Sequence, residues 1–160
     1  MNYYELFDLP MLPSVDASNL ARKYFELQKK YHPDFFSQED SIQQATAEEM
    51  SAAINMAFNI FKSKQGTIEY FLKQKGILQD DSQQPLPPDF LMEMMDLNES
   101  IDENEDQARS NAFAYSKSLD ASIDSILTKQ AECSAEEMAQ LQDYYYKKKY
   151  LQRILDRLAD

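Results

Sequence analysis

The sequence is poor in glycine, cysteine and histidine, with two, one and one of these residues in a chain of 160, and it has no tryptophan. Because so few glycines and no alternating runs of valine, isoleucine and threonine are present, strands and tight turns have little support, and we expect an all-helical fold. A single cysteine excludes an intramolecular disulfide. One cysteine and one histidine about a hundred residues apart also make a poor zinc or cluster site, so we expect neither metal nor cofactor. The simplest interpretation of Cys133 is a small residue near a helix end.

The chain also lacks an apolar run long enough to span a bilayer, which takes roughly 18 to 20 residues. Its first ten residues, MNYYELFDLP, have neither the basic start nor the apolar stretch of a secretory signal. They are acidic and contain no arginine, which argues against a mitochondrial transit peptide. We therefore expect a cytoplasmic protein with no membrane partner.

Basic residues are scarce as well, and the formal net charge is −12. Phosphate binding needs a basic surface, so nucleic acid is excluded as the main partner. The charge is spread unevenly: residues 1–75 carry eight basic and ten acidic side chains, whereas residues 76–160 carry eight and eighteen. Two differently charged halves suggest two different protein partners.

The hydrophobic residues, 43% of the chain, recur at helical spacing in the first half. One stripe predicts a helix from about Asp16 to Tyr31, and a second predicts a helix from about Ser41 to Lys62. The first stripe consists of Leu20, Tyr24, Leu27 and Tyr31, and the second of Met50, Ile54, Ala57 and Phe61. The first helix must stop at its end because Pro33 biases His32 away from the α region. The two helices are expected to pack antiparallel.

A proline-rich stretch, DDSQQPLPPD, separates the two halves and predicts a linker at residues 77–88. Beyond it, three helical patterns run from about residue 89 to 104, 106 to 131 and 135 to 159. The third begins with a capping box, Ser134 and Glu137. We therefore predict one module at residues 1–76 and a three-helix bundle at residues 89–160.

The stretch KKYHPDFF joins the two helices of the first module and holds the only histidine. Arg22, Glu26 and Lys29 fall on the solvent side of the preceding helix, with Lys23 and Lys30 beside them. One interpretation is a solvated helix face with an ordinary turn. The other is a docking element, because no nucleophile or second acid-base group accompanies His32 to make it catalytic.

The first helix of the predicted bundle carries more apolar residues than one buried face requires. One stripe, facing the bundle core, is Phe90, Met94, Leu97 and Ile101. The opposite side carries Leu91, Met92 and Met95, with Glu99 and Glu103 in line and Asp96 at the edge. This side fits either a protein-binding surface or a helix buried on two sides. On the last helix the expected inward face is Leu141, Tyr144, Leu151, Leu155 and Leu158, while Tyr146, Tyr150, Arg153 and Arg157 lie on another face.

The motif YHPD, preceded by LARKYFELQKK and by the opening YYELFDLP, resembles a J-domain, the module that activates DnaK-type chaperones. The resemblance implies that His32, Pro33 and Asp34 dock on the chaperone and stimulate its ATPase. It also implies docking cations at Arg22 and Lys29, with Lys23 and Lys30 secondary. The chain departs from general J-domains at two positions, Phe25 and Glu26, where those modules often have basic residues.

The second half makes the resemblance more specific. A J-domain followed by IEYFLKQKG, a short linker and FLMEMMDLNESIDE is similar to the bacterial form of the HscB family, co-chaperones of iron-sulfur cluster assembly. This implies two partners, a DnaK-type (HscA-like) chaperone and an iron-sulfur cluster scaffold (IscU-like). The implied scaffold contacts are Leu91, Met92, Met95, Asp96, Glu99, Glu103 and Tyr150. Family members often have leucine in place of Met95 and phenylalanine in place of Tyr150.

These observations predict a non-enzymatic co-chaperone that delivers the scaffold to the chaperone and promotes cluster transfer. Two alternatives stay open. The first is a J-domain protein that serves a different client. The second is an enzyme or cluster carrier that uses His32 and Cys133.

Overall fold

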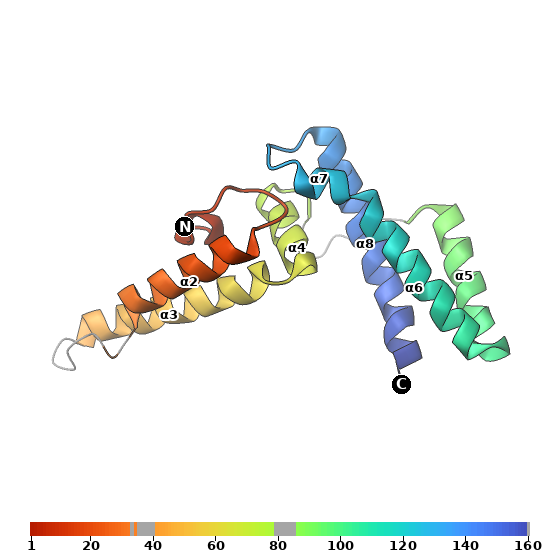
Figure 1. The fold of residues 1–160 in the computed structure, drawn as a ribbon, viewed down its shortest axis with the longest axis horizontal. Coiled ribbons are helices and arrows are strands. Elements are labelled where there is room, and N and C mark those ends of the chain that lie inside the picture. Colours follow the sequence, from red (N-terminus) through yellow and green to blue (C-terminus); the bar gives the residue numbers. More distant parts are fainter. Residues whose placement is uncertain (33, 35–40, 79–85, 160) are drawn as a thin grey trace. The chain divides into compact units, whose positions relative to one another are not determined.

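The computed structural model describes residues 1–32, 34, 41–78 and 86–159 (Figure 1). All regular elements among these residues are helices, which confirms the predicted all-α fold class. Contacts divide the chain into two compact units, Met1–Phe71 and Leu72–Asp160. The division falls inside a helix rather than in the predicted linker, of which residues 79–85 lie outside the described part. The predicted boundary at residues 77–88 stays a prediction.

A helical hairpin forms the body of the first unit: α2 (Ala17–Tyr31) packs against α3 (Ser41–Phe61). Asp16 caps α2, since its Oδ2 accepts a hydrogen bond from the Asn19 amide at 2.9 Å. Between the helices, the Tyr24 and Phe58 rings lie 4.2 Å apart, and the Tyr24 hydroxyl donates to Asn55 Oδ1 at 2.7 Å. Gln28, one turn further along α2, donates to Asn55 Oδ1 at 3.0 Å, so higher numbers on α2 meet lower numbers on α3 and the pairing is antiparallel, as predicted.

Aromatic rings close one end of this hairpin. The short helix α1 (Tyr3–Leu6) places Tyr4 against Phe61, with ring centroids 5.0 Å apart, and Tyr70 stacks on Tyr3 at 5.2 Å. Tyr70 belongs to α4 (Lys64–Gln74). The Tyr4 hydroxyl donates to the Leu12 carbonyl at 2.8 Å, so the buried ring leaves no unpaired hydroxyl.

The two glycines of the chain lie in α4 and just after it, and each meets a backbone requirement there. At Gly66 a Cβ atom would lie 2.8 Å from the Ile60 carbonyl oxygen, so only glycine lets α3 and α4 approach this closely. Gly76 has φ +74° just after α4, in the left-handed region that ends many helices.

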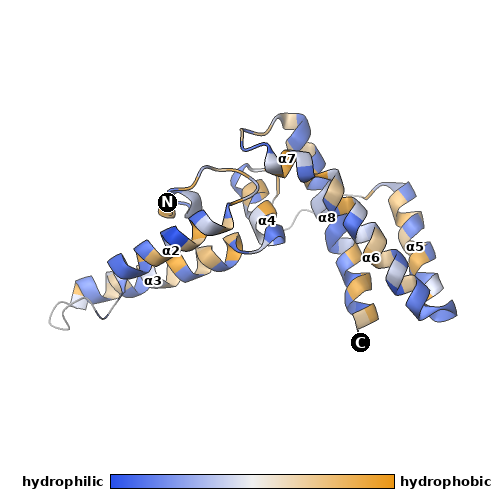
Figure 2. Cartoon of the chain, viewed as in Figure 1, coloured by the Kyte–Doolittle hydropathy of each residue, from blue (hydrophilic) through white to orange (hydrophobic). Residues whose placement is uncertain are grey.

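In the second unit, α5 (Pro88–Glu103), α6 (Glu105–Ser122) and α8 (Ala135–Ala159) pack around one core. The core residues are Phe90, Met94, Leu97, Ala108, Ala112, Leu151, Ile154 and Leu158. Figure 2 shows hydrophobic and hydrophilic bands alternating along α5, as expected of a helix with one face in a core. The predicted three-helix bundle therefore corresponds to α5, α6 and α8.

The predicted helix over 106–131 is wrong in its second half. α6 ends at Ser122, and a separate five-residue helix, α7 (Asp124–Thr128), follows. The junction residue Ile123 has φ −112° and ψ 2°, and its side chain is 1% exposed. Burial of this side chain at a non-helical position explains the break, which periodicity alone does not reveal.

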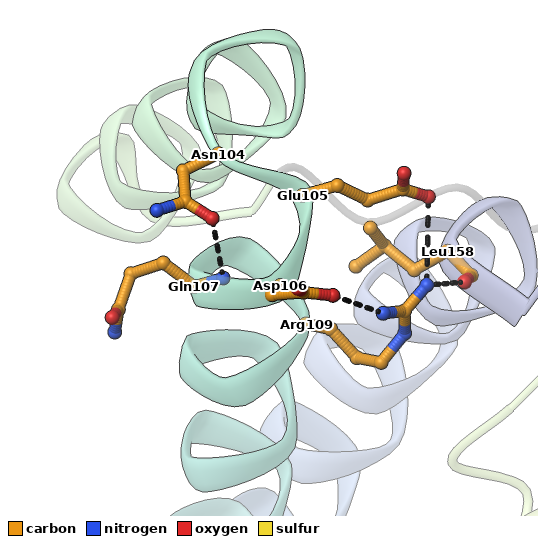
Figure 3. Close-up of polar contacts among 6 residues, drawn as sticks. All are labelled: Asn104, Glu105, Asp106, Gln107, Arg109 and Leu158. Atoms are coloured by element: carbon orange, nitrogen blue, oxygen red, sulfur yellow. Dashed lines mark hydrogen bonds and ion pairs between the residues drawn. The ribbon is translucent and has the colours of Figure 1, made fainter.

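Polar contacts fix the ends of α5 and α6 (Figure 3). Asn104 ends α5 and caps α6, since its Oδ1 accepts from the Gln107 amide at 3.1 Å. Arg109 Nη2 donates to the Leu158 carbonyl at 2.7 Å and so satisfies one of the last carbonyls of α8. The same guanidinium also pairs with Asp106, at 3.1 Å.

Candidate functional site

The basic side of α2 is exposed, as the sequence predicts. Arg22, Lys29 and Lys30 all point to solvent. Arg22 is held along the helix, with Nη1 3.2 Å from Glu26 Oε1 and Nη2 2.6 Å from Asn19 Oδ1. Exposed pairs of this kind contribute little to stability, so Arg22 can exchange Glu26 for a partner's carboxylate at small cost.

Lys23 differs from the expected free cation. Its side chain is 16% exposed, and Nζ lies 3.4 Å from Asp8 Oδ2 and also donates to the Asp8 carbonyl. Asp8 itself adopts φ 50°, in the left-handed region. Lys23 therefore connects α2 to the segment after α1. Helical periodicity could not predict this contact, because Lys23 and Asp8 are fifteen positions apart in the sequence.

Phe25 interrupts the basic side with a ring that is 65% exposed. The Lys29 ammonium lies 5.4 Å from the centre of this ring, within the range of a cation–π contact. The α2 surface thus combines cations with one exposed aromatic.

At the end of α2, His32 leaves the helix with φ −61° and ψ 128°. The Asp34 amide donates to His32 Nδ1 at 3.2 Å, and Asp34 Oδ2 lies 3.5 Å from the same nitrogen. The structure thus joins His32 and Asp34 in one local turn, while Pro33 lies outside the described residues. No structural finding tests the docking role of this motif.

The outward side of α5 matches the predicted rotation of the helix. Phe90, Met94 and Leu97 are buried, whereas the side chains of Met92 and Met95 are 64% and 58% exposed. Asp96, Glu99 and Glu103 are exposed beside them, and Leu91 is half-buried. This rules out a helix buried on two sides within this chain. We refer to Leu91, Met92, Met95, Asp96, Glu99, Glu103 and Tyr150 as the α5 surface.

Tyr150 joins the α5 surface from α8. Its ring meets Phe90 edge-on, with centroids 6.0 Å apart, so it is half-buried and also supports the core. The inward face of α8 needs one correction. Ile154 is 3% exposed and fills the core, while Leu155, predicted to point inward, is only half-buried. The reason is that α8 faces both α5 and α6, and their positions decide which of two adjacent apolar residues is covered.

No group of three or more histidine, cysteine or acidic side chains suited to a metal ion occurs in the described part of the chain. Burial raises the pKa of the Cys133 thiol, which disfavours the thiolate that would bind metal or attack a substrate. Among the described residues, no helix is both long and apolar enough to cross a membrane.

Comparison with known proteins identifies relatives of part of the chain. Residues 86–159 match the family model described as the HSCB C-terminal oligomerisation domain. The chain is 38% identical over 104 residues to the co-chaperone protein HscB homolog of Vibrio vulnificus strain YJ016, covering 64% of this chain and 61% of that protein. It is 39% identical over 103 residues to the homolog of Vibrio cholerae strain O395, covering 64% and 60%. These alignments span about three fifths of the relatives' length.

Solved structures extend the similarity to the full chain. Chaperone HscB from Vibrio cholerae superposes with a TM-score of 0.71 at 27% identity, covering 99% of this chain and 96% of that one. Human co-chaperone protein HscB has the same fold, with a TM-score of 0.80 at 24% identity over 99% of this chain and 81% of that one. The relatives are named co-chaperones rather than enzymes. Residues 86–159 thus carry the HSCB C-terminal domain, and over its full length the chain is similar to HscB co-chaperones.

Proposed function

We propose that this protein is a cytoplasmic co-chaperone with two docking surfaces, one in each structural unit. The α2 surface and the His32–Asp34 turn bind a DnaK-type, HscA-like chaperone and stimulate its ATPase. The α5 surface holds an IscU-like scaffold on which iron-sulfur clusters are built. Delivery of the scaffold to the chaperone then promotes cluster transfer and the maturation of iron-sulfur proteins.

One observation carries this proposal: two exposed surfaces of opposite character occur in separate units of one chain. Around α2 the exposed groups are cations beside His32, whereas around α5 they are methionines and carboxylates. Methionine adapts its shape to a partner, and the carboxylates select a basic one. A co-chaperone that holds its client raises the client's local concentration at the chaperone, so modest affinities at each surface suffice.

The chaperone surface is tested by substitutions in the turn after α2. His32→Gln and Asp34→Asn should each abolish ATPase stimulation, because the side chains that the turn presents are removed while the helices are untouched. Both side chains are largely exposed, at 47% and 86%, so the fold should survive. Steady-state ATP hydrolysis by the purified chaperone is the measurement, with circular dichroism as the check on folding.

Asp89→Asn is the matched control, because it removes an exposed carboxylate from the other unit. It should stimulate the chaperone as the unaltered protein does. Full stimulation by either turn variant would exclude the docking role of this turn. A client other than the scaffold would be revealed if the chain stimulates the chaperone but binds no iron-sulfur scaffold in calorimetric titration.

A further inference from the structure

A basic ridge runs along α8 beside the α5 surface. Lys149, Arg153 and Arg157 recur every four residues, so they lie along one side of the helix, and all three are exposed. Two other α8 cations are already paired. Lys147 Nζ is 2.9 Å from Asp143, and Lys148 Nζ is 2.7 Å from Asp120. The ridge is therefore the part of α8 with positive charge to offer a partner.

The C-terminal part of this ridge, Arg153 and Arg157, borders a small cleft between α5 and α8. Its volume is about 250 Å³, and it is lined by Asn98, Tyr150, Arg153, Ile154 and Arg157. Ile154 and the half-buried Tyr150 give it an apolar floor. Arg157 is partly engaged, since Nη1 donates to Asn98 Oδ1 at 3.3 Å.

Among the described residues, the Arg153 side chain makes neither a hydrogen bond nor an ion pair. Asp156, three residues further along α8, accepts from Gln152 at 2.9 Å, and Asp102 lies one turn after Asn98 on α5. Neither carboxylate is ion-paired with Arg153 or Arg157 in the part of the chain that the structure describes. A guanidinium beside an apolar floor is thus open to a carboxylate from outside.

We propose that this cleft binds a carboxylate of the scaffold protein, with Arg153 as the principal donor and Arg157 beside it. The guanidinium fork matches a carboxylate with two parallel hydrogen bonds, and the apolar floor strengthens the pair by excluding water. The inference rests on the proposed scaffold function and deepens it. The partner must then carry charges of both signs, basic groups opposite Asp96, Glu99 and Glu103 and an acid opposite Arg153.

Calorimetric titration of the full chain with the purified cluster-free scaffold protein tests this. Arg153→Glu should weaken binding roughly tenfold or more at low salt, because a charge pair becomes a repulsion. Arg153→Gln should weaken it less, and the loss should shrink as salt is added. Lys117→Glu makes the same charge change on the exposed side of α6 and should alter the affinity less than about twofold. Replacing the matching scaffold acid by lysine should restore binding to Arg153→Glu.

The same titrations separate this inference from the proposed function. If the unaltered protein does not bind the scaffold, both fail. If it binds, and Met92→Ala weakens binding while Arg153→Glu behaves like Lys117→Glu, only the carboxylate cleft is wrong. Thermal melts check the fold. Because the Arg153 side chain makes no hydrogen bond or ion pair with another described residue, its variants should have the same melting temperature as the unaltered protein.

Discussion

At the scale of single residues, the two methionines of the α5 surface lie outside the core. Met92 and Met95 are more than half exposed, so truncating them opens no cavity in the core. Tyr150 is different because its ring packs on Phe90. Truncating Tyr150 is therefore expected to affect the fold, whereas truncating either methionine is not.

Met92→Ala and Met95→Ala should each cost on the order of 1 to 2 kcal/mol of scaffold binding and less than about 0.5 kcal/mol of stability. Phe113→Ala is the control, since that ring is 57% exposed on α6 and its loss should leave binding unchanged. Titration calorimetry and thermal melts measure the two quantities. A large fall in melting temperature for either methionine variant would contradict the exposed position of these side chains.

Tyr150→Ala should lower both scaffold affinity and the melting temperature, because the ring serves the surface and the core together. Tyr150→Phe keeps the ring and its edge-on contact with Phe90, so it should restore both. Restored stability without restored affinity would place the hydroxyl group, rather than the ring, in the interface.

At the scale of elements, the start of α8 is fixed by a capping box with a third member. The Ser134 amide donates to Glu137 Oε1 at 2.9 Å, and the Glu137 amide donates to Ser134 Oγ at 3.1 Å, as the sequence predicts. Lys129, which follows α7, pairs with the same carboxylate. The hydrogen bond from Lys129 and the one from the Ser134 amide hold the pKa of Glu137 below its usual range.

The lowered pKa of Glu137 gives this cap a pH dependence of known sign. The stabilisation is fully present above the ordinary carboxyl pKa and is lost as pH falls through the lower value of the folded protein. The Ser134 amide resonance should report this titration by NMR, with a midpoint below about 4.3, the ordinary glutamate value. In Glu137→Gln that transition should disappear. A midpoint at or above the ordinary value would contradict the Lys129 contact.

At the scale of the whole molecule, each unit has its own core. Aromatic rings around Phe61 close the first unit, while Phe90, Met94 and Leu97 anchor the second. Separate cores suit a protein that holds two partners, because each surface is then supported by side chains from its own unit. The division inside α4 assigns the last turn of that helix to the second unit.

Fragments 1–76 and 77–160 should each be helical in isolation, since the cut leaves α4 whole and separates the aromatic core around Phe61 from the core shared by α5, α6 and α8. The sum of their circular dichroism spectra should equal the spectrum of the full chain. An unfolded fragment would show instead that the residues around α4 tie the stability of one unit to the other.

The sequence by itself determined the features that depend on near neighbours. Apolar spacing predicted the ends of α2, α3, α5 and α8 within a residue or two, and it predicted that Met92 and Met95 point away from the core. The spacing of Ser134 and Glu137 predicted the capping box at the start of α8. Such features follow from the helical period and from contacts three or four residues apart.

Only the tertiary structure decided the features that depend on distant neighbours. Lys23 is held by Asp8, Ile154 rather than Leu155 fills the core, and Ile123 breaks a helix that periodicity continues. The cleft at Arg153 likewise exists only where α8 meets Asn98 of α5. A helical period fixes which side chains share a face, but the neighbouring element decides whether that face is covered, paired or left open, because burial and charge pairing depend on which distant residues the fold brings together.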